Sequence, residues 1–328
     1  MDKRRSLALN ILLFIASIIV CLALLEAVLA TGLFDQEDNP HPVLIPPKFR
    51  EIDDAINAKN AAFAKNNRFG FNDVDRTPEK KPGVFRIAIL GDSFIWGDGA
   101  PYDATWNHKL EKLLKQYSDS IEVLSWGHNG WSTRDEYDFL VAHAVEFSID
   151  YVIIGFVTND PDLKDIPQRT FAFYKSRELK PLRIIFPRSV HFLSDCAAGI
   201  LYRFVKDFGY PAWEAKLYSD ENLKKYATLI DSVSTLCKSS QIPLLFVLTS
   251  TSYIDYCQSR FNLVIPILER DSIPYVNALP AIKRELSGIN PRQLWANPAN
   301  GHPGERLTSI IAREVYNYLV ATVLPKQT

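Results

Sequence analysis

The sequence has little cysteine, almost no methionine and almost no net charge. Four cysteines among 328 residues exclude the disulfide-rich architecture of small secreted domains. The single methionine is the first residue, so the Met-rich surfaces of adaptable binding proteins are excluded as well. Lys and Arg number 37 against 38 Asp and Glu, a formal net charge of -1, which leaves no basic field to hold nucleic acid. We therefore expect no nucleic-acid partner.

The remaining composition is ordinary for a folded chain. Hydrophobic residues make up 47% and charged residues 23%, which excludes wholesale disorder and low-complexity sequence. The length allows one large domain or two modest ones. The apolar residues are unevenly distributed, and their longest run lies at the N-terminus.

This N-terminal run predicts a membrane anchor. From Leu7 to Leu33 the only strongly polar residues are Asn10 and Glu26. The run exceeds the roughly 20 residues that cross a bilayer as a helix. We expect Glu26 to lie near the outer interface or to pair with a partner helix. Residues 1–34 are therefore predicted to form a single-pass transmembrane helix.

The basic residues before the run predict the topology. Lys3, Arg4 and Arg5 precede it, so the positive-inside rule places the N-terminus in the cytoplasm and the bulk of the chain outside. We thus predict a cell inner membrane protein with an extracytoplasmic, periplasmic domain. A cleaved signal peptide is the alternative, because Val28–Ala30 resembles a cleavage site. The apolar run favours the anchor, since signal peptides carry only about 7–15 apolar residues.

The rest of the chain predicts one α/β domain behind a linker. Prolines predict an extended connector over residues 35–83, with one short helix at Glu51–Lys65. Over residues 84–328, short apolar runs alternate with amphipathic segments, which indicates a parallel sheet with helical crossovers. Strands are expected at Val84–Leu90, Ile121–Trp126, Tyr151–Val157, Ile242–Leu248 and Ile273–Val276. Helices are expected at Thr105–Tyr117, Ser132–Phe147, Glu221–Ser239, Tyr256–Glu269 and Glu305–Val323, the second opening with a capping box of Thr133 and Glu136.

One long insertion interrupts the alternation. Residues 160–220 are rich in aromatic side chains and have no clear period. A segment of this length inside a compact domain is usually functional or a small subdomain. We interpret it as a cap over the sheet edge, with local packing as the alternative.

Polar residues stand where the predicted strands end, which is where open α/β sheets bind ligands. Ser93 follows the first strand, the glycine turn 127–130 follows the second, and Asn159 follows the third. His302 precedes the last helix. A hydroxyl, flexible backbone N–H groups, an amide and an imidazole together indicate nucleophilic acyl transfer. Ser93 would attack once His302 takes its proton. The N–H groups of Ser93 and Gly130 and the amide of Asn159 would then bind the oxyanion.

These separated motifs resemble the SGNH/GDSL hydrolase family. They are Gly91-Asp92-Ser93, the turn ending at Gly130, Asn159-Asp160 and His302-Pro303, in the family's order and each near a strand end. The resemblance runs from about Val84 to the C-terminus. It implies a flavodoxin-like three-layer α/β/α domain with a parallel sheet of about five strands. It also implies Ser93 as nucleophile, His302 as base, an oxyanion hole of Ser93, Gly130 and Asn159, and ester substrates, often acetyl groups on carbohydrates.

The chain departs from the family pattern beside His302. The family commonly places an Asp two or three residues before the His, where this chain has Asn300 and Ala299. The Asp of a triad orients the imidazole and stabilises its cation, whereas Asn300 could orient the ring but not neutralise it. The site could then work as a Ser–His dyad, with a backbone carbonyl, or with a carboxylate from elsewhere. Alternatively the enzyme is slow or inactive. A second departure is the segment Gly155–Asn159, where many members have a glycine two residues before the Asn and this chain has Val157.

Three further residues are secondary candidates. Asp92 fits a structural hydrogen-bonding role, and His128 in the glycine turn is the best rival base. Asp160 stands at the end of the third strand. Asp92 and Asp160 together leave a retaining glycosidase as a weak alternative, because that reaction needs two carboxylates across a cleft.

The sequence therefore predicts a membrane-anchored serine esterase or acyl hydrolase, or an O-acetyltransferase, that acts on acylated carbohydrate or a small ester. The sequence contains neither a zinc-type cluster nor a dinucleotide fingerprint, so we expect no metal and no cofactor. The alternative is a catalytically weak or inactive binding or scaffold protein that keeps the fold, in an envelope polysaccharide system. The sequence indicates no protein partner.

Overall fold

The computed structural model describes residues 3–31, 47–168, 177–206 and 208–324. The chain divides into two compact units, which we describe one at a time. The first combines the N-terminal part of the chain, up to Arg50, with Gln168–Ala212. The second combines Glu51–Pro167 with Trp213–Thr328 and holds every strand found in the described residues.

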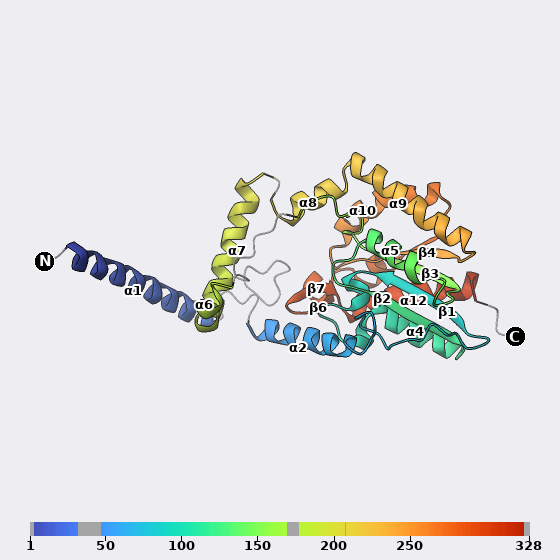
Figure 1. Cartoon of the computed structure of the whole chain (residues 1–328), viewed down its shortest axis with the longest axis horizontal. Coiled ribbons are helices and arrows are strands. Elements are labelled where there is room, and N and C mark those ends of the chain that lie inside the picture. Colours follow the sequence, from blue (N-terminus) through green and yellow to red (C-terminus); the bar gives the residue numbers. More distant parts are fainter. Residues whose placement is uncertain (1–2, 32–46, 169–176, 207, 325–328) are drawn as a thin grey trace. The chain divides into compact units, whose positions relative to one another are not determined.

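The second unit is built on a five-stranded parallel sheet of order β2-β1-β3-β4-β5, and Figure 1 shows its strands. This is the flavodoxin-like order, with its switch point between β1 and β3. The first three strands are almost continuously apolar and buried because helices cover both of their faces. The strands are β1 (Phe85–Gly91), β2 (Ile121–Gly127), β3 (Tyr151–Phe156), β4 (Leu244–Leu248) and β5 (Tyr275–Asn277).

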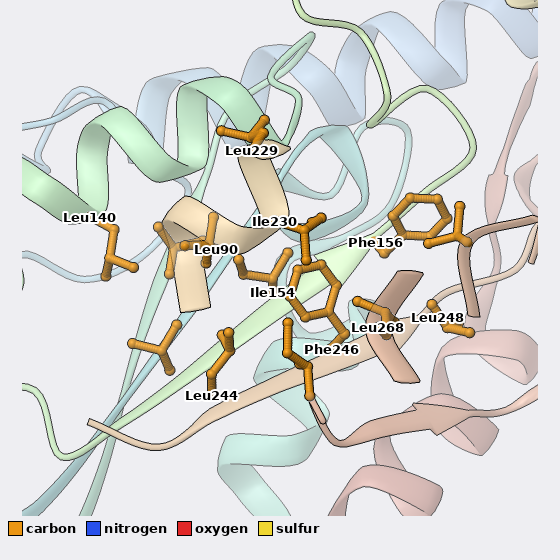
Figure 2. Close-up of a cluster of buried hydrophobic side chains, with 14 of the residues drawn as sticks. Leu90, Leu140, Ile154, Phe156, Leu229, Ile230, Leu244, Phe246, Leu248 and Leu268 are labelled. Carbon is orange, nitrogen blue, oxygen red and sulfur yellow. The ribbon is translucent and has the colours of Figure 1, made fainter. Parts of the chain in front are cut away.

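Helices pack on the two faces of the sheet through alternating side chains. Leu90, Ile154 and Phe246 point to one face and join the cluster that Figure 2 shows. Ile89, Ile153 and Val247 point to the other face. The first face carries α5 (Thr133–His143), α9 (Asp220–Ser239) and α10 (Ile254–Arg270). The second carries α4 (Trp106–Tyr117), α11 (Leu279–Leu286) and α12 (Glu305–Thr322). The predicted three-layer α/β/α architecture is confirmed.

The predicted strands and main helices all occur, with ends shifted by a few residues. The capping box of α5 lies one residue earlier than predicted, at Ser132 and Asp135. The sequence analysis did not predict α11, the four-residue helix α3 (Ser93–Trp96), or the antiparallel hairpin of β6 (Trp295–Asn297) and β7 (Asn300–Pro303).

The segment expected to be a linker contains the predicted short helix and further folded chain. Helix α2 spans Pro47–Ala64, against the predicted Glu51–Lys65, and the residues that follow it pack into the second unit. Phe71 is 1% exposed and belongs to the core cluster. The buried Asp73 accepts a hydrogen bond from the backbone N–H of Ser125 in β2 at 2.9 Å. Residues 35–46 lie outside the described part of the chain, so the linker there stays a prediction.

The first unit joins the apolar N-terminal helix to part of the predicted insertion. Helix α1 (Lys3–Ala30) includes Ser6–Ala30, which is long and apolar enough to cross a membrane. The insertion contributes α6 (Lys180–Ile185) and α7 (Pro187–Phe204), and α8 (Tyr210–Leu217) continues from this unit into the second. The predicted role of residues 160–220 as a cap stays a prediction.

Glu26 pairs with another helix of the same chain. Its carboxylate accepts hydrogen bonds from the backbone N–H groups of Arg188 (3.2 Å) and Ser189 (2.8 Å), and from the Ser189 hydroxyl (2.8 Å). These N–H groups open α7, so the carboxylate lies at the positive end of the helix dipole. Of the two expectations for Glu26, the structure shows pairing with a helix.

Candidate active site

The candidate residues of the second unit lie at the carboxyl ends of three neighbouring strands. Ser93 follows β1, Gly130 follows β2 and Asn159 follows β3. Because β1 lies between β2 and β3 in the sheet, these residues gather beside the switch point of the fold. His302 comes from the hairpin strand β7, just before α12.

Ser93 is the first residue of α3, and Asp92 caps this helix. The Asp92 carboxylate accepts a hydrogen bond from the backbone N–H of Phe94 at 2.8 Å, as an N-cap residue does. Gly97 ends the helix in the left-handed conformation, with φ of 85°. The short helix fixes the direction in which the Ser93 side chain leaves the sheet.

Three glycines in register allow this helix to pack closely on the strand ends. Gly91 pairs with Gly127 of β2 and with Gly155 of β3. A Cβ on any of the three would collide with, or crowd, the side chain of Ile95, which is fully buried. Gly155 thus makes room for the helix that carries Ser93. The sequence contains this signal, but only the strand register reveals it.

The structure brings His302 to Ser93. The Nε2 atom of His302 lies 2.8 Å from the Ser93 hydroxyl oxygen, a hydrogen-bonding distance between residues 209 positions apart. The ring also meets the edge of Phe94, with centroids 5.3 Å apart. A neutral imidazole in this position can accept the hydroxyl proton as serine attacks a carbonyl.

Asn300 occupies the position on the far side of the imidazole. Its Oδ1 lies 2.6 Å from His302 Nδ1 and accepts the backbone N–H of His302 at 3.1 Å. Its Nδ2 donates to Asp53 Oδ1 at 3.0 Å and to Asp98 Oδ1 at 3.3 Å. The predicted orienting residue is therefore in contact with the ring. The sequence analysis missed Asp53 and Asp98, because neither belongs to a motif.

Asn159 also reaches the nucleophile's surroundings. Its Nδ2 lies 3.4 Å from Asp92 Oδ2, and the Ser93 hydroxyl lies 3.2 Å from the same oxygen. The Asn159 amide also contacts the carbonyl of Trp131 at 3.5 Å, which links it to the turn after β2. Gly130 lies in that turn with φ of 79°, where a glycine is favoured, and its carbonyl accepts from Lys164 Nζ at 2.8 Å.

Of the secondary candidates, Asp92 contacts Ser93, whereas no contact with Ser93 or His302 is recorded for His128 or Asp160 among the described residues. His128 is exposed, contacts the carbonyl of Asn129 at 3.1 Å and stacks on Trp131. Asp160 is fully buried and accepts the backbone N–H of Val157 at 3.1 Å. Asp92 is 2% exposed. Two carboxyls this buried do not face each other across an open cleft, so the retaining-glycosidase alternative is wrong.

A group of buried acids lies beneath the site. Desolvation raises the pKa of the Asp160 and Glu136 carboxyls well above their usual range, and the nearby charge of Asp92 raises both further. Burial also raises the pKa of Asp92, although the hydrogen bond from Phe94 and the charge of His302 oppose the effect. Neither oxygen of Glu136 has a hydrogen-bond partner among the described residues. A buried, unpartnered carboxyl favours its neutral form.

A cavity of about 430 Å³ adjoins the same elements. Trp96, the last residue of α3, borders it, as do His128 and Asn129, which precede Gly130. Lys65, at the end of α2, contributes a positive charge. The volume of the cavity lies in the range of small-molecule sites, and its lining combines the indole of Trp96 with polar groups.

No known family profile matches the sequence, and no curated protein matches it either. Solved structures similar to the chain include the acetylxylan esterase Axe2 from Geobacillus stearothermophilus, as a catalytic mutant. It is 15% identical, the match covers 76% of this chain and 100% of that one, and the TM-score is 0.47. The psychrotrophic esterase EstA from Pseudoalteromonas sp. matches at 14% identity over 71% and 94% of the two chains, with a TM-score of 0.42.

A third similar structure is a protein described as lipolytic and of the G-D-S-L family, from Desulfitobacterium hafniense. It is 14% identical, with coverage of 71% of this chain and 98% of that one and a TM-score of 0.43. The strand order of the sheet is the flavodoxin-like order that the sequence motifs imply. In fold, the chain is similar to the SGNH/GDSL hydrolases.

Proposed function

We propose that the protein is a serine ester hydrolase of the SGNH type. The observation that carries the proposal is the 2.8 Å contact between the Ser93 hydroxyl oxygen and His302 Nε2. Serine and imidazole at hydrogen-bonding distance, at the carboxyl edge of a parallel sheet, form a nucleophile and its base.

The reaction follows from the roles of these groups. Ser93 attacks the ester carbonyl as His302 Nε2 takes its proton, and the carbonyl oxygen becomes an oxyanion. The N–H groups of Ser93 and Gly130 and the Asn159 amide stabilise that charge. The imidazolium then protonates the departing alcohol and leaves an acyl-serine. Water, activated by the same imidazole, attacks the acyl-serine and releases the acid.

The substrate we propose is an acylated carbohydrate, with acetyl as the acyl group. The cavity bordered by Trp96 and His128 supports this, because aromatic and polar side chains together suit a sugar ring. Transfer to a sugar hydroxyl is the related reaction, and it requires that hydroxyl to outcompete water at the acyl-serine. Product analysis with and without an added oligosaccharide acceptor separates transfer from hydrolysis.

Steady-state kinetics test the proposed activity. The full chain in detergent should hydrolyse p-nitrophenyl acetate and acetylated xylo-oligosaccharides, and Ser93→Ala should remove that turnover. The exposed Ser120→Ala is the matched control and should keep it. Turnover that is equal in Ser93→Ala and in the parent protein would overturn the proposal. Absence of all turnover would favour the inactive binding or scaffold protein.

We also propose that α1 anchors the protein in the inner membrane, with the N-terminus in the cytoplasm and the esterase unit outside. The apolar length of Ser6–Ala30 and the basic residues before it support this topology. Alkaline phosphatase fused after residue 328 should be active in cells, because it needs an oxidising compartment. If a reporter that works only in the cytoplasm is active at this position and alkaline phosphatase is not, the proposed orientation is wrong. Release of a shortened soluble chain would indicate a cleaved signal peptide.

A further inference from the structure

The site has a base without the usual neighbouring carboxylate, and two distant carboxylates contact the residue that replaces it. Asp53 comes from α2, and Asp98 follows α3. Both contact the amide of Asn300, at 3.0 and 3.3 Å, whereas Asn300 itself contacts the imidazole of His302. This arrangement settles how the amide must be turned.

The two ends of an asparagine amide differ in what they can do. The nitrogen only donates hydrogen bonds and the oxygen only accepts them, while a carboxylate only accepts. Facing Asp53 and Asp98, the amide must present its nitrogen to them. Its oxygen is then turned toward His302 Nδ1, 2.6 Å away.

The imidazole responds to this orientation. An oxygen beside Nδ1 requires Nδ1 to carry the proton, and in a neutral ring Nε2 is then the bare nitrogen that accepts from Ser93. The opposite amide orientation would place the amide nitrogen beside Nδ1, so that Nδ1 would be bare and Nε2 would carry the ring proton. A protonated Nε2 cannot accept the proton of Ser93. An asparagine in the place of a triad aspartate fails for this reason elsewhere, at a cost of about 10⁴-fold in kcat.

Asp98 has a second contact that Asn300 cannot supply. Its Oδ2 lies 4.0 Å from His302 Nε2, the nitrogen that becomes positively charged when it takes the serine proton. A negative charge at this distance favours the cation. Asp98 therefore lies near the positive charge of the protonated His302 ring, which the aspartate of a triad stabilises from the Nδ1 side.

Other residues hold the pair of acids and the amide together. Asn297 Nδ2 donates to Asp53 Oδ1 and to the carbonyl of Gly99, each at 2.8 Å. Gly99 has φ of 71°, and a Cβ there would collide with the Asn300 side chain. Asn57 of α2 accepts the Gly99 N–H at 2.8 Å. The amide of Asn300 is confined on the side of Gly99 and tied to α2 on the other.

We propose that Asp53 and Asp98 are positioning residues that fix the orientation of the Asn300 amide, and thereby hold His302 in the tautomer that accepts the serine proton. The inference rests on the proposed Ser93–His302 function for its effect on the rate. Its structural part, the tautomer of His302, is measurable without any turnover.

The kinetic test uses the full chain in detergent and five variants. Asp53→Ala and Asp98→Ala each remove one acceptor, and the double variant removes both. The exchange variant Asp53→Asn with Asn300→Asp moves the carboxylate next to His302 and places an amide donor at position 53. Asp54→Ala, on the exposed side of the same helix, is the matched control.

The first readout is kcat and KM for p-nitrophenyl acetate as a function of pH. We expect Asp53→Ala/Asp98→Ala to lower kcat by about 100-fold or more, toward the roughly 10⁴-fold cost of a wrong tautomer, with little change in KM. The exchange variant should regain most of the activity that Asp53→Ala loses, and Asp54→Ala should match the parent protein. Failure of the exchange variant to exceed Asp53→Ala, with both folded by circular dichroism, would overturn the inference.

The second readout is the imidazole ¹⁵N chemical shifts of His302, assigned by comparison with His302→Gln. In the parent protein Nδ1 should be protonated and Nε2 bare, and the double variant should shift toward the opposite tautomer. An unchanged tautomer in the double variant overturns the inference, whatever the rate does. A tautomer that changes as expected in a protein without Ser93-dependent turnover supports the positioning role and rejects the proposed function instead.

Discussion

The Ser93 hydroxyl lies between two partners, His302 Nε2 at 2.8 Å and Asp92 Oδ2 at 3.2 Å. Asp92 therefore does more than cap α3, because its Oδ2 also lies 3.4 Å from the Asn159 amide. Replacing it with Asn keeps an oxygen for the cap but turns a nitrogen toward Asn159, a donor facing a donor. For Asp92→Asn we expect near-parental thermal stability and a kcat lowered by about 10- to 100-fold, since an oxyanion donor contributes about 10²–10³.

The companion variant Asp92→Ala separates the two roles. It loses the cap as well, so its free energy of unfolding should fall by about 1 kcal/mol. Urea unfolding together with kinetics distinguishes the variants. Parental activity in Asp92→Asn would show that the residue only caps the helix.

Gly130 allows a test of the oxyanion turn with a matched control. Gly130 and Gly83 have nearly the same positive φ, 79° and 78°, and a Cβ on either would have no neighbour within 4 Å. Gly130→Ala and Gly83→Ala should each lower the free energy of unfolding by about 1 kcal/mol, because an alanine is strained in the left-handed conformation. Only Gly130→Ala should also lower kcat, because its N–H would turn away from the oxyanion. Equal kcat in the two variants, at equal stability, would remove Gly130 from the site.

The buried acids predict how stability depends on pH. Burial raises the pKa of Glu136 well above its usual range in the folded state, so between the unfolded and the folded pKa the native protein binds more protons than the unfolded chain. Stability from the neutral carboxyl is therefore present at acidic pH and is lost as the pH rises through the folded pKa. Glu136→Gln imitates the neutral acid, so its melting temperature should exceed that of the parent increasingly from pH 5 to pH 9.

Glu221→Gln is the control for that experiment, since the Glu221 side chain is 83% exposed. It should leave the pH dependence of the melting temperature unchanged. A Glu136→Gln variant that is less stable than the parent at pH 9 would contradict the assignment.

Glu26 predicts a local effect within the first unit. It binds the backbone N–H groups of Arg188 and Ser189, so Glu26→Ala leaves these amides without their acceptor. Hydrogen exchange in the first turn of α7 should accelerate by about 5- to 30-fold, the equivalent of about 1–2 kcal/mol for a lost cap. Exchange in α9 should not change. Equal exchange in α7 of the two proteins would mean that this contact does not hold the helix.

The sequence predicted the parts of the site that lie in short motifs beside strands. Ser93, Asn159 and His302 each follow or precede an element with a strong apolar pattern, so their neighbourhood in the sheet could be inferred. The structure confirms the fold and brings Ser93, Asn300 and His302 together. Gly130 as an oxyanion donor stays a prediction.

The parts that sequence reasoning missed depend on contacts between distant segments. Asp53 lies 247 residues from Asn300, in the short helix predicted within the connector, and neither its position nor its neighbours distinguish it from Asp54. Gly91, Gly127 and Gly155 form a row only in the strand register. The contact of α1 with α7 is likewise invisible in either segment alone, because α7 carries no charge pattern that points to Glu26.

The central claim is that Ser93 is a nucleophile activated by His302, and covalent trapping tests it most directly. The full chain, treated at pH 8 with a fluorophosphonate, should gain the mass of one phosphonyl group on Ser93, located by peptide mapping. The adduct should disappear in Ser93→Ala and form far more slowly in His302→Ala. An unmodified parent protein, or an adduct that persists in Ser93→Ala, would contradict the account.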